Sequence, residues 1–382
     1  MSRWRTQRKL LNRVTAEVVT WPALADADRT LEVIRAWDKA TWQAAELAIL
    51  MQGIGPYLHH TLPSTPIYEA LPATFRQRLA DGYQLNDARL KRLLRDLVDI
   101  LDAAHRGGLA LMPLKGPLLA TGSYDSPALR PMADLDLLVR PSDLPALAAI
   151  LHDLGYQSRP QSSPGGSVHI FHRPDNRTVV SRRSNHPDNP RPVEVHIRLK
   201  KYFWDIYRLD DLTDYLWAES QPGQLLGAQA WLPAPARFLT YLAVHTMVHH
   251  LFGEGRLIHL LDLAHVAPTL GSLPVRHARW TYPVLCLAGR VLPGRFEGLA
   301  LSTLAPERPT RLRRWAETVP LDGRCGLNVD PRPPHEKGRW ELRWLRWRPN
   351  PLRLALAYGD TPLLFAYGRH FFTIFRRLLE GI

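Results

Sequence analysis

The sequence predicts an α+β fold: a small mixed β-sheet flanked by helices, with a helical N-terminal region and a helical C-terminal region. Three patterns support this prediction. Apolar residues keep helical spacing before the middle of the chain, polar and apolar residues alternate in short segments in its middle, and helical spacing then returns. We therefore expect a helical N-terminal region at 1–108, an α/β core at 109–200, a helical domain at 201–319, and a linker with a Trp/Arg-rich helical region at 320–382.

The N-terminal region is predicted to be a series of helices. Glycine and proline interrupt the apolar pattern at 53–56 and again at 63–66, so helices should end there. The last helix is expected from about Asn86 to His105, where leucines recur every three or four residues. Gly107-Gly108 is expected to end it.

The core is predicted to alternate short strands with helices. Leu109–Leu114 is an apolar run of strand length, and Pro117 suits the first turn of a helix that continues to about Tyr124. A second helix is expected at 144–154, before Gly155. Further strands are expected near Tyr156 and at 167–172, and after the core we predict helices at 207–217, 234–252 and 255–266.

The segment Asp134-Leu135-Asp136 carries the strongest chemical signal. In a strand, side chains alternate between the two faces, so Asp134 and Asp136 should share one face while Leu135 and Leu137 share the other. Acidic residues are poor strand formers. Two of them on one face therefore suggest a function, and carboxylate oxygens are the ligands that Mg²⁺ prefers.

A second alternating segment completes the candidate site. In residues 193–199, Glu194, His196 and Arg198 fall on one face and the apolar residues on the other. If this strand lies beside the first, Glu194 adds a third carboxylate to Asp134 and Asp136. Three carboxylates are what a two-metal phosphoryl-transfer site requires. The alternative is a solvated sheet face with three scattered acids.

Composition narrows the class of protein. The chain has 382 residues and a formal net charge of +13, which favours anionic partners such as nucleotides, nucleic acid or anionic lipid. Much of the excess positive charge is arginine, and a GC-rich genome would produce the same arginine content. Two cysteines cannot build a disulfide framework, and the basic start of the chain has no apolar segment typical of a signal peptide. We expect a cytoplasmic protein without a transmembrane segment.

These motifs together resemble a known family. Leu114-Lys115-Gly116, the segment 130–139, the expected helix before Gly155 and Val193-Glu194-Val195-His196 are similar to the bacterial nucleotidyltransferase-like proteins of the DNA polymerase beta-type superfamily. The nearest group is an uncharacterised nucleotidyltransferase family. Residues 241–263, with His245 and Asp262, look like that family's helical segment after the core.

The resemblance implies the reaction and its participants. A nucleotidyl group would pass from a nucleoside triphosphate to an acceptor hydroxyl, with release of pyrophosphate and with Mg²⁺ or Mn²⁺ as the cofactor. Asp134 and Asp136 match the two metal-binding acids, and Glu194 matches the third acid. The acceptor stays open: the sequence does not distinguish a small molecule, a peptide and RNA.

Lys115-Gly116 matches the family's phosphate-binding turn. The superfamily usually has its glycine turn closer to the first Asp, and Gly122-Ser123 fits that shorter spacing. We favour Lys115-Gly116 because it follows a strand and opens a helix, whose N-terminus attracts phosphate. Gly122-Ser123 would lie near the other end of that helix, where the dipole disfavours anions.

Two further residues are predicted to contact the nucleotide or the acceptor, and each could have a structural role instead. Arg130 is near enough in sequence to contact a phosphate through its planar fork, or it is a structural arginine. His196 shares the face of Glu194, so it could orient that carboxylate, contact the acceptor, or be a satisfied structural histidine.

Two other motifs are weaker. His245 and His249 have the spacing of a zinc-binding helix, but the glutamate of metalloproteases and a clear third ligand are missing, so a polar helix face near the active cleft is favoured. Residues 339–348 interleave tryptophan with arginine at helical spacing. This basic C-terminal region could contact nucleic acid or a membrane surface, or it could pack on the protein's own core.

Two other functions compete with nucleotidyl transfer. Some glycosyltransferases hold Mn²⁺ and a sugar nucleotide with Asp-x-Asp, although they need neither the Lys115-Gly116 turn nor the Glu194 strand. A degenerate nucleotidyltransferase core could also serve as a non-catalytic nucleotide-binding protein or scaffold. The presence of all three acids argues against this second alternative.

Overall fold

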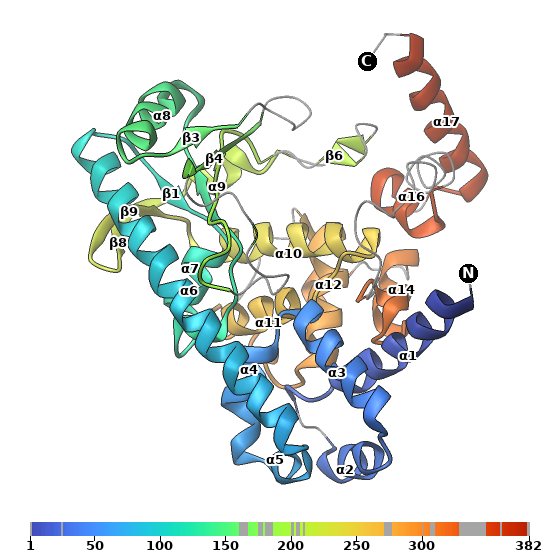
Figure 1. Cartoon of the computed structure of the whole chain (residues 1–382). Coiled ribbons are helices and arrows are strands. Elements are labelled where there is room, and N and C mark those ends of the chain that lie inside the picture. Colours follow the sequence, from blue (N-terminus) through green and yellow to red (C-terminus); the bar gives the residue numbers. More distant parts are fainter. Residues whose placement is uncertain are drawn as a thin grey trace.

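The computed structural model describes residues 2–23, 26–159, 167–174, 179, 186–199, 202–203, 207–208, 211–270, 277–299, 301–305, 310–327, 349–359 and 361–379. Figure 1 shows a mixed β-sheet beside the long helix α6, with the N-terminal helices below it and the C-terminal helices to its right. The predicted α+β class is confirmed, with helices on both sides of the core in the sequence.

The N-terminal region is helical, as predicted. Its elements are α1 (Ser2–Val18), α2 (Ala27–Arg35), α3 (Lys39–Gln52), α4 (Gly55–Thr61), the 3₁₀ helix η1 (Leu62–Ser64), α5 (Pro66–Ala70) and α6 (Ala73–Arg106). The carboxylate of Asp38 accepts a hydrogen bond from the Thr41 N–H (2.8 Å) and so begins α3. Gly53, with φ of 72°, ends α3 in the left-handed conformation at the predicted break.

The helix expected from Asn86 begins thirteen residues earlier, at Ala73. Its first half carries few apolar residues besides Phe75 and Leu79, so the periodic pattern there is too sparse to mark it. Both side chains are nevertheless buried, in the same hydrophobic cluster as α3 and α4. Tertiary packing therefore extends this helix beyond its sequence signal.

The core sheet has five strands in the order β1-β2-β5-β4-β3. Its elements are β1 (Met112–Pro113), α7 (Gly116–Gly122), η2 (Pro127–Leu129), β2 (Leu135–Leu138), η3 (Pro141–Asp143), α8 (Leu144–Asp153), β3 (Gln157–Ser158), β4 (Val168–His172) and β5 (Val193–His196). The two central strands, β2 and β5, are parallel, and the other neighbouring pairs are antiparallel. The strands expected at 109–114 and 193–199 are shorter than predicted.

Strand β2 lies between two hydrophobic clusters. Leu135, Leu137 and Val139 pack on one side, against leucines of α6 and α8. Leu138 packs on the other side, in the large cluster that includes the helices after the core. Because residues two apart share a face, Asp136 lies on the side of Leu138. The candidate acids therefore face the helical region that follows the core.

The chain after the core differs in part from the prediction. The elements are β6 (Tyr202–Phe203), β7 (Tyr207–Arg208), α9 (Thr213–Trp217), β8 (Gln221–Leu225), β9 (Ala228–Leu232), α10 (Pro235–Phe252), α11 (Leu257–Val266), η6 (Ala267–Thr269), α12 (Ala278–Val291), α13 (Leu301–Leu304), α14 (Arg311–Thr318), η8 (Gly323–Cys325), α16 (Pro351–Tyr358) and α17 (Leu363–Leu379). The helices expected at 234–252 and 255–266 are confirmed as α10 and α11. The helix expected at 207–217 is wrong in its first half, where β7 lies, because aromatic Tyr207 suits a strand equally well.

The hairpin of β8 and β9 was not predicted from the sequence. Its turn is Leu226-Gly227, and both residues have positive φ, as a tight two-residue hairpin loop requires. The Trp231 N–H donates to the Leu111 carbonyl (2.9 Å), so β9 lies against the residue that precedes β1. The predicted Trp/Arg helix at 339–348 lies outside the described residues. In the part of the chain that is described, no helix is long and apolar enough to cross a membrane.

Candidate active site

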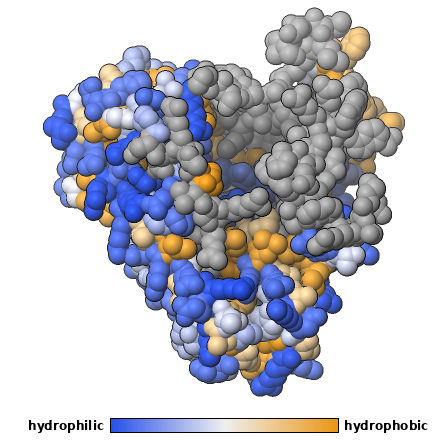
Figure 2. Space-filling model, in the orientation of Figure 1, coloured by the Kyte–Doolittle hydropathy of each residue, from blue (hydrophilic) through white to orange (hydrophobic). Residues whose placement is uncertain are grey.

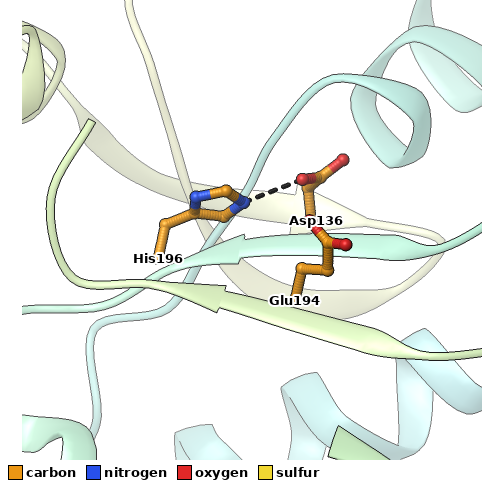
Figure 3. A group of neighbouring side chains, drawn as sticks. All are labelled: Asp136, Glu194 and His196. Carbon is orange, nitrogen blue, oxygen red and sulfur yellow. Dashed lines mark hydrogen bonds and ion pairs between the residues drawn. The ribbon is translucent and has the colours of Figure 1, made fainter. Parts of the chain in front are cut away.

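Asp136 and Glu194 are brought together by the two parallel strands at the centre of the sheet. The register of β2 and β5 sets Asp136 directly opposite Glu194 and Leu138 opposite His196. In-register residues of neighbouring strands point to the same face about 4.8 Å apart. Asp136, Glu194 and His196 each offer one possible metal-ligand atom, and these three atoms all lie within 4.8 Å of one another (Figure 3). These three side chains form the candidate metal centre, and the predicted convergence of acids from two strands is present for this pair.

Asp136 is buried and accepts two hydrogen bonds on one oxygen. Its Oδ1 atom accepts from Lys115 Nζ (2.6 Å) and lies 2.8 Å from His196 Nε2. Burial alone would raise the pKa of Asp136, but the charge of Lys115 and the hydrogen bond with His196 hold it below its usual range. Asp136 is therefore a carboxylate at neutral pH, which is the form that binds a cation.

Asp134 immediately precedes β2 and is not one of the three clustered donors. Its charge nevertheless interacts with those of Asp136 and Glu194, so it lies near them. Burial and the neighbouring Asp136 raise the pKa of Asp134 to about 7. Such crowding of carboxylates is what a divalent cation relieves. The predicted role of Asp134 as a metal ligand stays a prediction.

Lys115-Gly116 follows β1 and opens α7, as the sequence predicts, and Gly122-Ser123 lies at the other end of that helix. Lys115 has φ of 43° and ψ of −116°, a sparsely populated backbone conformation for a side-chain-bearing residue. A Cβ atom on Gly116 would come within 2.5 Å of the Met132 sulfur and 2.9 Å of Arg130 Nη1. Glycine is needed here because the segment before Asp134 passes this close. The turn thus aims the Lys115 side chain at Asp136.

Arg130 forms a buried ion pair with the helical region. Its Nη2 donates to Asp262 Oδ2 (2.8 Å) and its Nε to Asp262 Oδ1 (3.2 Å), while the Tyr124 hydroxyl donates to the same Oδ1 (2.8 Å). Asp262 is on α11, so this pair ties the loop before β2 to the helices after the core. The structural alternative for Arg130 therefore has a partner, and phosphate contact by this residue stays a prediction.

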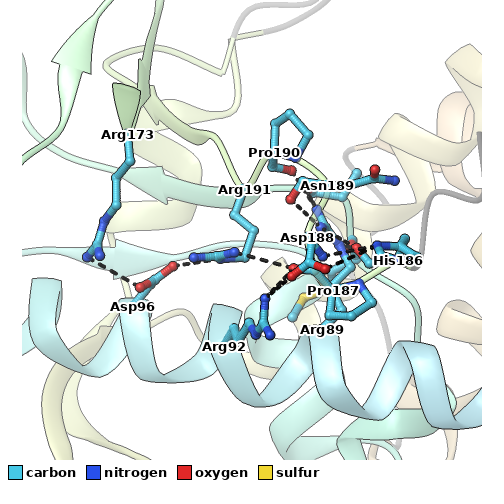
Figure 4. A network of polar contacts seen from close by, with 12 residues as sticks. Arg89, Arg92, Asp96, Arg173, His186, Pro187, Asp188, Asn189, Pro190 and Arg191 are labelled. Atoms are coloured by element: carbon cyan, nitrogen blue, oxygen red, sulfur yellow. Dashed lines mark hydrogen bonds and ion pairs between the residues drawn. The ribbon is translucent and has the colours of Figure 1, made fainter. Parts of the chain in front are cut away.

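Arg89 on α6 connects two segments beside the candidate site, and the sequence did not indicate it. Its buried guanidinium donates hydrogen bonds to five carbonyl oxygens, two before β2 and three before β5 (Figure 4). The first group belongs to Met132 and Ala133, and the second to His186, Asn189 and Pro190. Burial lowers the pKa of Arg89 to about 10, so it is still charged at neutral pH. One side chain thereby joins the two segments that lead to Asp134 and Glu194.

Tyr241 on α10 lies near the acids. It is buried, and its hydroxyl lies near enough to Lys115, Asp134, Asp136 and Glu194 to feel their charges. Burial raises the pKa of this hydroxyl, so it is neutral at physiological pH. No sequence motif marks Tyr241, because its place depends on how α10 packs against the sheet.

Two histidines of α10 and one of α11 cluster beside Tyr241. The ring of His245 stacks on Tyr241, and ring centroids of His245, His249 and His259 are 4.5 to 5.9 Å apart. His259 of α11 is the third histidine that the sequence spacing did not reveal. Burial lowers the pKa of His259 well below its usual range, so this imidazole is neutral. The polar helix face expected at His245 and His249 is therefore present beside Tyr241.

The comparisons with known proteins add a family to this geometry. A family model described as an uncharacterised nucleotidyltransferase matches residues 35–272. This range includes every candidate site residue described above and ends before the C-terminal helices, from α12 onward. No curated protein matches the chain. No solved structure matches it either.

Proposed function

The chain belongs to the uncharacterised nucleotidyltransferase family, and from this premise we propose that it moves a nucleotidyl group from a nucleoside triphosphate to an acceptor hydroxyl, releasing pyrophosphate. The observation that carries the proposal is the in-register pair of Asp136 and Glu194, with His196 and Lys115 around it. The hydroxyl would attack the α-phosphorus, and the bond to the pyrophosphate oxygen would break.

The donor set fits a hard divalent cation. Asp136 and Glu194 offer carboxylate oxygens, the ligands of Mg²⁺ and Mn²⁺, and His196 adds a nitrogen that suits Mn²⁺ better than Mg²⁺. We assign Asp134 as a further ligand because it immediately precedes β2 and is near enough to Asp136 and Glu194 for their charges to interact. When bound, the cation would neutralise charge that develops on the phosphate oxygens and lower the pKa of the acceptor hydroxyl.

The protein's own residues would orient the reactants. His196 is hydrogen-bonded to Asp136, so it holds that carboxylate in one orientation. Lys115 brings a buried positive charge beside the acids, and its ammonium could move from Asp136 to a triphosphate oxygen. Tyr241, as a neutral hydroxyl, can donate a hydrogen bond to substrate from the opposite side. The buried position of these groups excludes water and strengthens each electrostatic contact.

A label-transfer experiment tests the proposal. Purified protein would be incubated with each α-labelled nucleoside triphosphate, Mg²⁺ or Mn²⁺, and cell extract as the source of acceptor. We expect labelled product and pyrophosphate with the unmodified protein and with Asp99→Asn, an exposed acid on α6 that serves as the matched control. Asp136→Asn should lose both signals.

Other outcomes would overturn the proposal. Equal transfer by Asp136→Asn would remove the candidate site from the reaction. Transfer of sugar from a sugar nucleotide, with no transfer from plain triphosphates, would establish the glycosyltransferase alternative. Binding of triphosphate without turnover on any acceptor would establish the scaffold alternative.

A further inference from the structure

The C-terminal helix α17 exposes an unusual amount of apolar surface. Eight large hydrophobic side chains are exposed among the described residues, and five of them lie within twelve residues of α17. These five are Leu364 (81 % exposed), Phe365 (66 %), Phe371 (44 %), Phe372 (67 %) and Phe375 (62 %). The other three are scattered along the chain. Scattered apolar residues are ordinary on a protein surface, whereas a contiguous group marks an interaction site.

The five side chains share one face of the helix. At 100° per residue, Leu364, Phe365, Phe371, Phe372 and Phe375 fall within an arc of about 120°. The opposite face is packed: Ala366, His370 and Ile374 are buried, and the Tyr367 hydroxyl donates to the Pro349 carbonyl (2.9 Å). The fold therefore holds α17 with its aromatic face outward.

The helix lies at one end of the molecule. In Figure 1, α17 extends at the upper right, beside α16 and away from the sheet that carries the candidate active site. A few residues coloured as hydrophobic appear at the upper right rim of the surface in Figure 2. This position leaves the aromatic face free to meet a large flat surface without covering Asp136 and Glu194.

The charges beside this face favour an anionic surface. Arg369 and Arg376 are exposed and lie next to one edge of the aromatic arc, beside Phe365, and the segment Leu363–Leu379 contains no acidic residue. A second copy of the chain would bring a helix of the same positive charge against this one, which repulsion opposes. An aromatic face bordered by arginines is the composition of a helix that lies in the interface of a bilayer with anionic lipid.

We propose that α17 is an interfacial helix that binds the protein to the surface of membranes containing anionic lipid. Its seventeen residues would lie along the surface, with the aromatic face in the boundary between headgroups and acyl chains and the arginines at the phosphates. This inference does not depend on nucleotidyl transfer, since none of its residues belongs to the candidate active site.

Vesicle co-sedimentation of the full-length chain tests this proposal. The vesicles would be pure phosphatidylcholine, or phosphatidylcholine with about one-third phosphatidylglycerol. We expect binding to the anionic vesicles that weakens with added salt. The variant Phe365→Ser/Phe372→Ser/Phe375→Ser should bind at least about a thousandfold more weakly, because each of the three buried phenylalanines contributes about tenfold or more. The variant Arg369→Gln/Arg376→Gln should bind anionic vesicles about tenfold or more weakly, and its binding to pure phosphatidylcholine should be unchanged.

Leu50→Ser is the matched control, because Leu50 is an exposed apolar residue of α3 away from this face (40 % exposed), and it should bind like the unmodified chain. Circular dichroism and thermal unfolding should be unchanged in every variant. Vesicle binding by the triple variant that equals that of the unmodified chain would overturn the proposal. So would failure of the unmodified chain to bind both kinds of vesicle. A concentration-dependent dimer that the triple variant abolishes, without vesicle binding, would assign the face to a second copy instead.

Discussion

Asp136 and Glu194 lie directly opposite each other on the parallel strands β2 and β5, and their side chains point to the same face. Parallel neighbours in register are held by the hydrogen bonds of the whole sheet, so the separation of these two carboxylates is set by backbone and not by flexible loops. A cation site built from these two carboxylates would therefore be pre-organised.

The first prediction concerns metal affinity. Asp136→Asn and Glu194→Gln should each weaken Mn²⁺ binding by at least about tenfold to a hundredfold, since even outer-shell changes have effects of that size. Titration of the protein with Mn²⁺, followed by electron paramagnetic resonance of the free ion, measures this directly. Asp99→Asn should bind Mn²⁺ like the unmodified protein. Unaltered binding by both site variants would move the metal away from these strands.

The second prediction concerns the ion pair of Lys115 and Asp136. Lys115→Met leaves a buried carboxylate with one partner fewer, so the metal-free protein should lose about 3 kcal/mol of unfolding free energy. Added Mg²⁺ should restore part of this loss, because a cation replaces the missing charge. Urea unfolding with and without Mg²⁺ provides the measurement.

The matched control for this change is Lys91→Met on α6. Lys91 also pairs with an aspartate at 2.6 Å, but its side chain is exposed, so its pair with Asp87 contributes little. Equal destabilisation by the two substitutions would mean that the Lys115 pair is no more important than a surface contact.

The third prediction concerns pH. The pKa of Asp134 is raised to about 7 in the folded, metal-free protein, above its ordinary value near 4. The folded state therefore binds the proton more tightly than the unfolded state does, and the contribution of Asp134 to stability is lost as pH rises from about 4 through 7. Asp134→Asn removes this titration, so its stability relative to the unmodified protein should increase between pH 5 and 8.

This pH effect is measured as a difference between two proteins, because other groups titrate in the same range. Burial lowers the pKa of His250 to about 4, for example, which makes stability rise with pH over part of that window. Subtracting the Asp134→Asn profile from that of the unmodified protein cancels such groups. A difference that does not change with pH would show that Asp134 is ionised throughout.

Arg89 leads to the fourth prediction. Arg89→Lys keeps the positive charge but cannot reach five carbonyl oxygens with one ammonium group, so the segments before β2 and β5 should lose their fixed separation. We expect weaker Mn²⁺ binding by about tenfold together with lower stability. Arg95→Lys is the control, because Arg95 is an exposed arginine six residues further along α6. Reduced stability with unchanged Mn²⁺ affinity would make Arg89 structural only.

The sequence indicated the centre of the site but not its surroundings. Alternation placed Asp136 on one face of its strand, and Glu194 and His196 on one face of theirs, because a period of two determines the face. That the two strands are neighbours was a condition of the prediction, and the pairing of β2 with β5 meets it. Asp134 fits that pattern less well, since the strand begins only after it.

Arg89 and Tyr241 could not be predicted from any local pattern. Each is an ordinary residue of a helix, and its role arises from contact with segments far away in the sequence. Arg89, for example, donates to the carbonyl of Asn189, 100 residues further along the chain. Asp262 differs, because the family resemblance marked it without indicating its partner Arg130. Long-range pairings of this kind depend on how helices dock on the sheet, which single-sequence periodicity does not encode.

The last prediction distinguishes the two glycine turns. Gly116→Ala should lower the unfolding free energy by about 2 kcal/mol, because a methyl group would press on Met132, which is buried, and on Arg130, which is held by Asp262. Gly122→Ala, in the same helix, meets nothing within 4 Å and should change stability by less than about 1 kcal/mol. Urea unfolding and Mn²⁺ titration of both variants measure the effects. Because the displaced segment leads to Asp134, we expect weaker metal binding only in Gly116→Ala. Stronger loss of binding in Gly122→Ala would instead favour Gly122-Ser123 as the functional turn.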